Sequence, residues 1–306
     1  MPTTEKNKPQ PVIFGEALFD QFEERSVAGG APFNVAWHLN GLRAYPLFLS
    51  RVGDDEEGRH LKQLSEKWGL NTSCLQIDPT KETGKVLVKN DPDTGPAYEI
   101  KDDQAYDAIS YEQIAPHLNL PANTLLYHGS LALRHETCRE TLQKIREQLG
   151  FQCTVFFDLN LRPPWVEQDV ILHRLKEAHW LKCNADELKE IAHWQGWEAS
   201  DENLTFLTHT AIETFQLKGA VITLGADGSF AIDADGNTAK APQPEIHHLQ
   251  DTVGAGDSFS AMFIYGILKN WPLEKCLSHA ATLASRICTV EGGTSFNPEF
   301  YEDLQE

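Results

Sequence analysis

The segment Asp251-Thr252-Val253-Gly254-Ala255-Gly256-Asp257 combines an acidic side chain with three small residues, directly before an apolar stretch that begins at Ser258. Small residues let the backbone approach a ligand closely, and free N–H groups at a helix start attract an anion. A carboxylate at Asp257 would reach a hydroxyl held beside that anion. The segment therefore suits phosphoryl transfer, with Asp257 as the base and Gly254–Gly256 as the anion hole. The alternative is a glycine-rich turn in which Asp257 only caps the helix.

Other polar residues and glycines follow the ends of predicted strands. They are Glu16 and Asp20, then Asp158, Asn160 and Arg162, then Asn184 and Glu187, and finally Gly225, Asp227 and Gly228. In open sheets of parallel strands, ligands bind beyond the carboxyl ends of the strands. This edge therefore predicts a site for a polar, phosphorylated ligand, although each residue alone is also typical of a helix cap or a turn.

Short apolar runs that alternate with helical patterns must position these residues. The predicted strands are 12–15, 46–52, 124–128, 154–158, 179–183 and 220–224; the predicted helices are 32–40, 56–67, 136–149, 170–178, 185–193, 204–217, 258–269 and 273–288. This alternation predicts an α/β fold with a mostly parallel central sheet that helices cover on both faces. A hairpin formed by 85–88 and 96–101 interrupts the pattern and would form a small second lobe.

Composition excludes several classes of function. The formal net charge of −19 repels phosphate backbones and anionic lipid, so we expect no binding to nucleic acid or membranes. The longest apolar run has eight residues, against the roughly 20 that span a bilayer. The six cysteines are scattered along the chain without C-x-x-C spacing, and the N-terminal segment does not resemble a secretory signal. These features predict a reduced, cytoplasmic protein. The phosphate-binding motifs of P-loop kinases and Rossmann dehydrogenases are absent.

Two separate motifs identify a resemblance to a known family. The segment Asp251–Asp257 resembles the D-T-x-G-A-G-D signature of the ribokinase-like, or PfkB, carbohydrate kinases. The run Gly29-Gly30-Ala31-Pro32-Phe33-Asn34-Val35-Ala36, followed by Gly53 and Asp55, resembles the N-terminal signature of the same family. The resemblance extends from about residue 12 to about residue 296. It implies a single ribokinase-like domain over 1–306, a three-layer fold with a small β lid that includes 83–101.

The resemblance also implies roles for residues around a sugar. Asp20 matches the carboxylate that hydrogen-bonds sugar hydroxyls, a task that suits an acceptor with two oxygens. Gly29 and Gly30 would admit the sugar against the backbone, and Asn34 would supply a donor and an acceptor. The alternatives are helix capping for Asn34 and a plain turn for Gly30. Asp257 matches the catalytic base, and Gly254, Ala255 and Gly256 match the anion hole.

For the phosphate donor, the resemblance implies ATP with Mg²⁺. Asn184 and Glu187 match an N-x-x-E motif in which Glu187 holds magnesium through water, although this spacing alone usually marks a helix cap. Thr223, Gly225 and Gly228 match the turn that holds the nucleotide. Asp251, with backbone carbonyls nearby, matches a monovalent-cation site for K⁺, although the 289–294 loop differs from the family's usual form.

Among relatives of this kind, bacterial fructokinases resemble the chain most. The residues that carry this likeness are 15–20, 29–32 and 158–165. Arg162 would bind the substrate or a phosphate oxygen, or else form a structural ion pair with Asp158 or Glu187. The expected partners are a small sugar, with fructose first, and ATP; a homodimer through the β lid is a further expectation. The alternatives are a kinase for ribose, 2-keto-3-deoxygluconate or a nucleoside, and a non-enzymatic kinase-like regulator, which would have lost Asp257.

Overall fold

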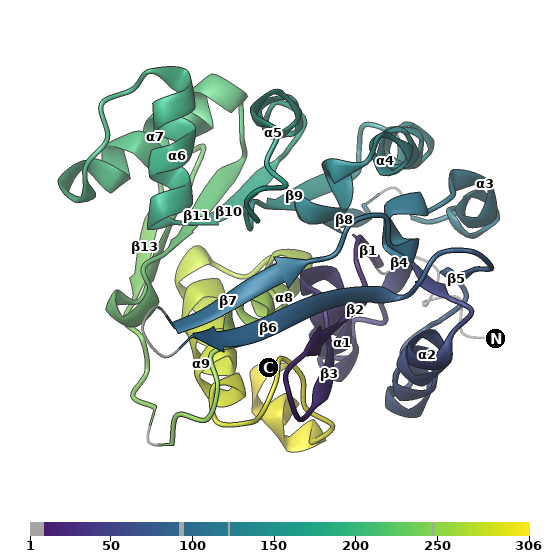
Figure 1. The fold of residues 1–306 in the computed structure, drawn as a ribbon. Helices are drawn as coiled ribbons and strands as arrows, with labels where there is room; N and C mark the ends of the chain where they lie inside the picture. Colours follow the sequence, from purple (N-terminus) through teal and green to yellow (C-terminus); the bar gives the residue numbers. More distant parts are fainter. Residues whose placement is uncertain (1–8, 92–94, 122, 247) are drawn as a thin grey trace, which may run out of the picture.

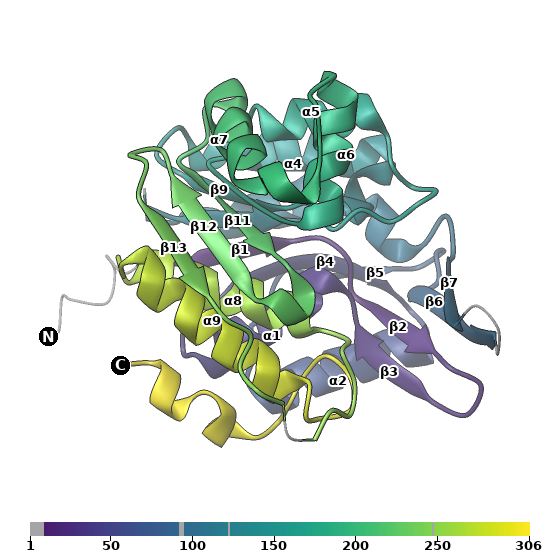
Figure 2. The same ribbon diagram turned by 90° about the vertical axis from the view of Figure 1, so that its left-hand side faces the viewer.

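A nine-stranded sheet forms the centre of the protein (Figures 1 and 2). The computed structural model describes residues 9–91, 95–121, 123–246 and 248–306. In sheet order the strands are β13 (Thr238–Ala241), β12 (Ser229–Asp233), β11 (Gly219–Thr223), β10 (Trp180–Asn184), β9 (Thr154–Asp158), β8 (Leu125–His128), β1 (Pro11–Phe14), β4 (Leu47–Gly53) and β5 (Leu75–Asp78). In this sheet order, all strands from β11 through β10, β9, β8, β1 and β4 to β5 are parallel. Strands β12 and β13 are antiparallel to their neighbours. The predicted, mostly parallel sheet is therefore confirmed.

Helices cover both faces of this sheet, as Figure 2 shows. One face packs against α1 (Ala31–Gly41), α2 (Glu56–Trp68), α8 (Ala255–Leu268) and α9 (Leu273–Ile287). The other face packs against α3 (Tyr111–Ile114), α4 (Glu136–Leu149), α5 (Gln168–Leu175), α6 (Ala185–Gln195) and α7 (Leu204–Phe215). Residues 258–266 of α8 are all buried, as its apolar character on every side predicts. The three-layer arrangement is confirmed.

A second sheet of four strands lies beside the carboxyl ends of the parallel strands (Figure 1). Its order is β3 (Ser26–Gly29), β2 (Leu18–Gln21), β6 (Gly84–Asp91) and β7 (Gly95–Ile100). The predicted hairpin corresponds to β6 and β7, but β2 and β3 were not predicted, because each has four residues and little apolar alternation. We call these four strands the β lid. Asp20 therefore lies on a lid strand.

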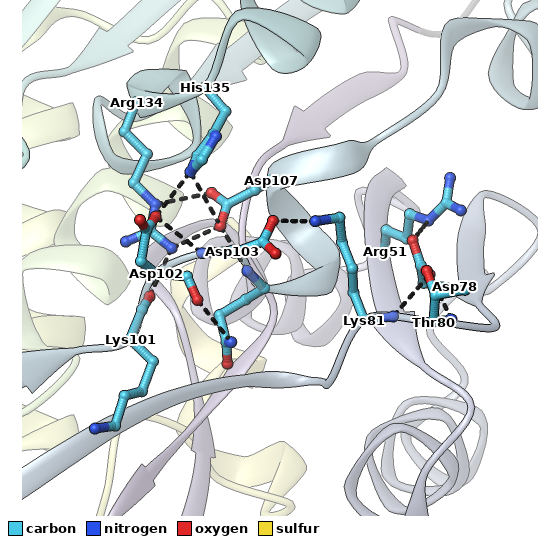
Figure 3. A network of polar contacts seen from close by, with 11 residues as sticks. Arg51, Asp78, Thr80, Lys81, Lys101, Asp102, Asp103, Asp107, Arg134 and His135 are labelled. Atoms are coloured by element: carbon cyan, nitrogen blue, oxygen red, sulfur yellow. Dashed lines mark hydrogen bonds and ion pairs between the residues drawn. The ribbon is translucent and has the colours of Figure 1, made fainter.

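A network of ion pairs fixes the base of the β lid (Figure 3). Lys81, which precedes β6, pairs with Asp103, which follows β7. Arg134 donates from Nε to Oδ1 of Asp107 at 2.8 Å and from Nη2 to the Lys101 carbonyl at 2.7 Å. Asp102, Asp107 and His135 come close enough to share a metal ion, but Arg134 hydrogen-bonds both oxygens of Asp107. We therefore assign this cluster to anchoring the lid.

Among the residues that the structure describes, no helix combines the length and apolar character needed to cross a membrane. All six cysteines are buried and unpaired.

Candidate active site

The Gly254–Asp257 turn starts helix α8 earlier than predicted. The helix begins at Ala255 rather than Ser258, and Gly254 at its N-cap has a left-handed φ of 75°. A Cβ atom on Gly254 would lie 2.3 Å from the Cα atom of Gly293, so this position requires glycine. Asp257 lies in the first helical turn. The interpretation of Asp257 as the helix cap is therefore wrong, because the backbone of Gly254 begins the helix.

The side chain of Asn34 connects the two motifs that are far apart in the sequence. Its Nδ2 atom donates to Oδ2 of Asp257 at 2.7 Å, and Asn34 lies inside α1 rather than at its cap. Helix capping by Asn34 is therefore wrong. The Oδ1 atom of Asn34 is buried without a partner, as expected of an acceptor whose donor comes from a ligand. Among the described residues, no group donates to Oδ1 of Asp257, so this oxygen is open to a substrate hydroxyl.

The pKa of Asp257 is shifted by its surroundings. Burial raises the pKa of this carboxyl; the hydrogen bond from Asn34 lowers it, the charge of Asp158 raises it, and the charges of Lys182 and Arg162 lower it. A raised pKa makes a carboxylate a better proton acceptor. The environment of Asp257 thus suits a general base.

The predicted sugar-binding residues lie around Asp257. A Cβ atom on Gly29 would lie 2.8 Å from Oδ2 of Asp20 on the neighbouring strand, and one on Gly30, which has a φ of 102°, would lie 2.8 Å from the Glu16 carbonyl. The two glycines therefore keep this part of the site open. Burial, followed by the charge of Asp257, raises the pKa of Asp20 to about 6. Asp20 and Asp257 are thus close enough to interact electrostatically.

Glu16 is a site residue to which the sequence analysis gave no role. It follows β1, its side chain is buried, and its Oε2 atom has no hydrogen-bond partner. Burial, together with the charge of Asp257, raises the pKa of Glu16 from 4.5 to about 7, against the lowering effect of a backbone hydrogen bond and of nearby arginines. Its place directly after a buried strand was a visible signal, but only the structure shows an unpartnered buried carboxyl oxygen. Such an oxygen fits a hydroxyl donor from a ligand.

This raised pKa predicts a pH-dependent effect of Glu16 on stability. The folded protein binds the Glu16 proton more tightly than the unfolded chain does, so Glu16 favours folding at low pH, and this contribution is lost as the pH rises through about 7. We expect the free energy of unfolding of wild type, relative to Glu16→Gln, to fall by about 3 kcal/mol between pH 4.5 and pH 8. Urea unfolding at both pH values measures this difference. Parallel pH profiles for the two proteins would show that the Glu16 pKa is not shifted.

Arg162 is exposed, just beyond β9. The alternative role of Arg162 was a structural ion pair with Asp158 or Glu187. The structure does not show this pair, because Asp158 pairs with Lys182 at 3.0 Å. The oxygens of Glu187 instead accept from the backbone N–H groups of Leu161 at 2.7 Å and Asn184 at 2.9 Å. The charge of Arg162 lowers the pKa values of Glu16, Asp20 and Asp257. The guanidinium is therefore positioned near the carboxyl groups of the site.

Asn184 and Glu187 form a capping box at the start of α6. The Asn184 side chain accepts from the Glu187 N–H at 2.8 Å, and Glu187 accepts from the Asn184 N–H. The capping interpretation is therefore correct for these contacts. Each Glu187 oxygen still has a lone pair, and a carboxylate of fixed orientation at a sheet edge is a ligand type that suits Mg²⁺ or its waters. The magnesium role stays a prediction.

The segment Thr223–Gly228 forms a tight turn between β11 and β12. The Leu224 N–H donates to the Gly228 carbonyl at 2.8 Å. Gly228 has a φ of 90°, and a Cβ atom there would lie 2.2 Å from the Ala241 carbonyl. Gly225 also has a positive φ, of 59°. The turn thus leaves its backbone at the same sheet edge as Asn184, where a nucleotide is predicted to bind.

Asp251 connects the Gly254–Asp257 turn to the 289–294 loop. Its Oδ1 atom accepts from the Val253 N–H at 3.0 Å, and its Oδ2 atom accepts from the Gly292 N–H at 3.3 Å. Glu291 in this loop pairs with Arg25 on the turn between β2 and β3 of the β lid. The loop is therefore in contact with both the turn and the lid. The K⁺ site at Asp251 stays a prediction.

Comparison with known proteins shows the family to which the chain belongs. The family described as pfkB family carbohydrate kinase matches residues 4–299. A putative sugar kinase of Pyrococcus horikoshii is 29% identical over 280 residues, which cover 90% of this chain and 85% of the relative. Its crystal structure with ATP has a TM-score of 0.79 at 26% identity and covers 92% of this chain and 93% of that one.

Two further relatives are enzymes with different substrates. A 5-dehydro-2-deoxygluconokinase of Geobacillus thermodenitrificans is 27% identical and covers 84% of this chain and 77% of the relative. A fructokinase of Vibrio cholerae, crystallised with fructose, ADP and calcium, has a TM-score of 0.81 at 22% identity and covers 97% and 99% of the two chains; this likeness shows the fold. The family match spans nearly all of the described residues. The chain belongs to the PfkB family of carbohydrate kinases.

Proposed function

We propose that this kinase transfers the γ-phosphoryl group of ATP to a primary hydroxyl of a small neutral sugar, with fructose as the first candidate. The observation that carries the proposal is the 2.7 Å hydrogen bond between Asn34 and Asp257. It brings the two family motifs together at the start of α8. The proposed base, the proposed anion-binding turn and the carboxyl groups of Glu16 and Asp20 are then near one another, as phosphoryl transfer to a hydroxyl requires.

In this mechanism, Asp257 accepts the proton of the attacking hydroxyl. The sugar oxygen forms a bond to the γ-phosphorus, the bond from that phosphorus to the bridging oxygen breaks, and ADP leaves. The N–H groups of the Gly254–Gly256 turn hydrogen-bond the phosphoryl oxygens. Bound Mg²⁺ would neutralise phosphate charge, and Asn184 and Glu187 are the residues that we propose to hold it through water. Thr223, Gly225 and Gly228 would contact the nucleotide, and K⁺ would bind at Asp251.

The carboxyl groups of the site favour a neutral sugar. The charge of Asp257 acts on Glu16 and on Asp20. The charge of Arg162 acts on all three carboxyl groups. Carboxyl groups accept hydroxyl donors well, and those that are ionised repel the carboxylate of a sugar acid. This argues for fructose over 2-keto-3-deoxygluconate or the substrate of the Geobacillus relative; ribose and nucleosides remain the neutral alternatives. Because Asp257 and its turn are intact, a non-enzymatic regulator is disfavoured.

A substrate panel tests this proposal. The purified protein is assayed for ADP release with ATP, Mg²⁺ and each of fructose, ribose, 2-keto-3-deoxygluconate and a nucleoside. We expect kcat/KM to be highest for fructose and lowest for the sugar acid. A preference for the sugar acid would contradict the neutral-sugar assignment and would give Arg162 the task of binding its carboxylate.

Substitution of Asp20 tests the sugar site separately. Asp20→Ala removes a charged acceptor whose hydrogen bond to a hydroxyl contributes roughly 1.5–3 kcal/mol, so we expect the sugar KM to rise about 10- to 100-fold. The KM for ATP should stay nearly unchanged. Gln21→Ala on the same strand is the matched control, because Asp20 and Gln21 are successive residues of β2 and successive side chains of a strand face opposite sides. A sugar KM equal to that of the control would remove Asp20 from the site.

The proposal also includes a cytoplasmic location and a homodimer. Six unpaired cysteines agree with a reducing, cytoplasmic environment. The homodimer through the β lid stays a proposal, which analytical ultracentrifugation would test.

A further inference from the structure

Lys182 and Asp158 form a buried ion pair beneath the start of α8. Their strands β10 and β9 are neighbours, and the two residues are paired in register. The Lys182 ammonium lies 3.0 Å from Oδ1 and 3.2 Å from Oδ2 of Asp158. The exposed fractions of the two side chains are 10% and 0%. The parallel register, rather than sequence proximity, creates this pair.

Two hydroxyl groups hold Asp158 in position. Ser260 of α8 donates to Oδ2 of Asp158 at 2.7 Å, and Tyr127 of β8 donates to the same atom at 3.3 Å. The Ser260 hydroxyl also lies 3.0 Å from the Gly256 carbonyl. The ion pair is therefore joined to the Gly254–Asp257 turn through Ser260.

The ammonium of Lys182 directly adjoins this turn. A Cβ atom on Gly256 would lie 3.4 Å from Nζ of Lys182, so glycine leaves the side of the ammonium that faces the turn uncovered. The charge of Lys182 also lowers the pKa of Asp257, so the ammonium acts electrostatically on the proposed base. A fixed, nearly dry cation stabilises developing negative charge far better than an exposed lysine does.

The acidic character of the chain and of the site favours a fixed cation at this place. The chain carries a net charge of −19, and the charges of Asp158 and Lys182 act on Asp257 together with that of Arg162. An ATP triphosphate that enters this acidic site needs positive charge at the place where the phosphoryl group transfers. Arg162 is exposed, whereas Lys182 is buried and held in place.

We propose that Lys182 binds the oxygens of the phosphoryl group during its transfer, as a positive component of the anion hole that Asp158 holds in position. This inference rests on the proposed kinase function. Lys182 keeps its proton throughout; the hydroxyl proton goes to Asp257, and the bridging oxygen leaves with ADP. The contact forms with the γ-phosphate, so it is present with ATP and absent with ADP.

The test must separate this role from a purely structural one. Lys182→Met leaves Asp158 buried without its partner and is expected to destabilise the fold. The informative variant is therefore the double substitution Lys182→Gln with Asp158→Asn, which restores a neutral hydrogen-bonded pair. Lys189→Met is the matched control, because Lys189 pairs with Asp186 and Asp201 at the surface of α6.

Three measurements are made on each protein: kcat, and the affinities for ADP and for a non-hydrolysable ATP analogue, both with Mg²⁺. We expect the double variant to fold, to lose about 10²–10³-fold in kcat, and to lose at least tenfold in affinity for the analogue while its affinity for ADP changes little. The Lys189→Met control should match wild type. A double variant that recovers near-normal turnover would overturn the proposal, as would an equal loss of affinity for ADP and the analogue.

The failure of this inference is distinguishable from the failure of the proposed function. If wild type phosphorylates none of the sugars in the panel, the proposed substrate class is wrong, yet the comparison of ADP with the analogue still decides whether Lys182 binds the γ-phosphate. If wild type is active and the double variant is too, only the role of Lys182 is wrong.

Discussion

Asp257→Asn is expected to lower kcat by about 10²–10⁴-fold, the usual effect of losing a positioned base. The amide keeps the size of the side chain, and its oxygen can still accept the hydrogen bond from Asn34, but it cannot take the proton of the attacking hydroxyl. Affinities for sugar and ATP should change much less. Because Gly254 and not Asp257 begins helix α8, the free energy of unfolding should not decrease.

Steady-state kinetics and urea unfolding of the purified variant check this prediction. Asp235→Asn is a matched control, because Asp235 is an exposed acidic residue in the turn between β12 and β13, at the opposite edge of the sheet. We expect this control to retain turnover. A well-folded Asp257→Asn protein with near-normal kcat would remove Asp257 from the chemical step.

Gly254→Ala is expected to cost both stability and activity. A left-handed φ strains an alanine by roughly 1–3 kcal/mol, and the added Cβ atom would lie 2.3 Å from the Cα atom of Gly293. Backbone at that distance must move. The Gly293 carbonyl accepts a hydrogen bond from Nε2 of His38 at 2.9 Å. Because Gly293 also adjoins Asn34, the displacement would reach the Asn34–Asp257 pair. We expect kcat to fall by about 10²-fold or more.

Gly236→Ala separates strain from displacement. Gly236 has a φ of 83°, close to that of Gly254, but a Cβ atom there meets nothing within 4 Å. We expect this variant to lose a similar amount of stability from backbone strain alone and to keep full activity. Equal activities for the two alanine variants, measured after correction for the folded fraction, would contradict the packing role of Gly254.

The sequence predicted the elements whose periodicity is clear. Helix α4 and strand β9 have the predicted bounds, 136–149 and 154–158, because one has a strong helical pattern and the other is a buried apolar run. Strands β2 and β3 were missed, since each has only four residues, too few to show a clear alternation of apolar and polar side chains. Their pairing with the predicted hairpin is a long-range contact that local pattern does not encode.

The candidate site was predictable where chemistry is concentrated in a short segment. The Asp251–Asp257 motif and Asn34 lie in two such segments, and the structure brings them into contact. Glu16 and Lys182 were not assigned roles, because their meaning depends on burial and on neighbours from other strands. Lys182 becomes notable only when the register of β9 and β10 places it against Asp158, and no spacing within the sequence reveals that register.

The most direct measurement for the central claim is a ³¹P NMR spectrum of wild type incubated with ATP, Mg²⁺ and fructose. We expect a new phosphate monoester on a primary carbon of the sugar, formed in equal amount with ADP, and no such signal with Asp257→Asn. ADP accompanied only by inorganic phosphate would contradict it, because the enzyme would then transfer the phosphoryl group to water. An unchanged ATP spectrum with fructose and with every other sugar of the panel would contradict it as well.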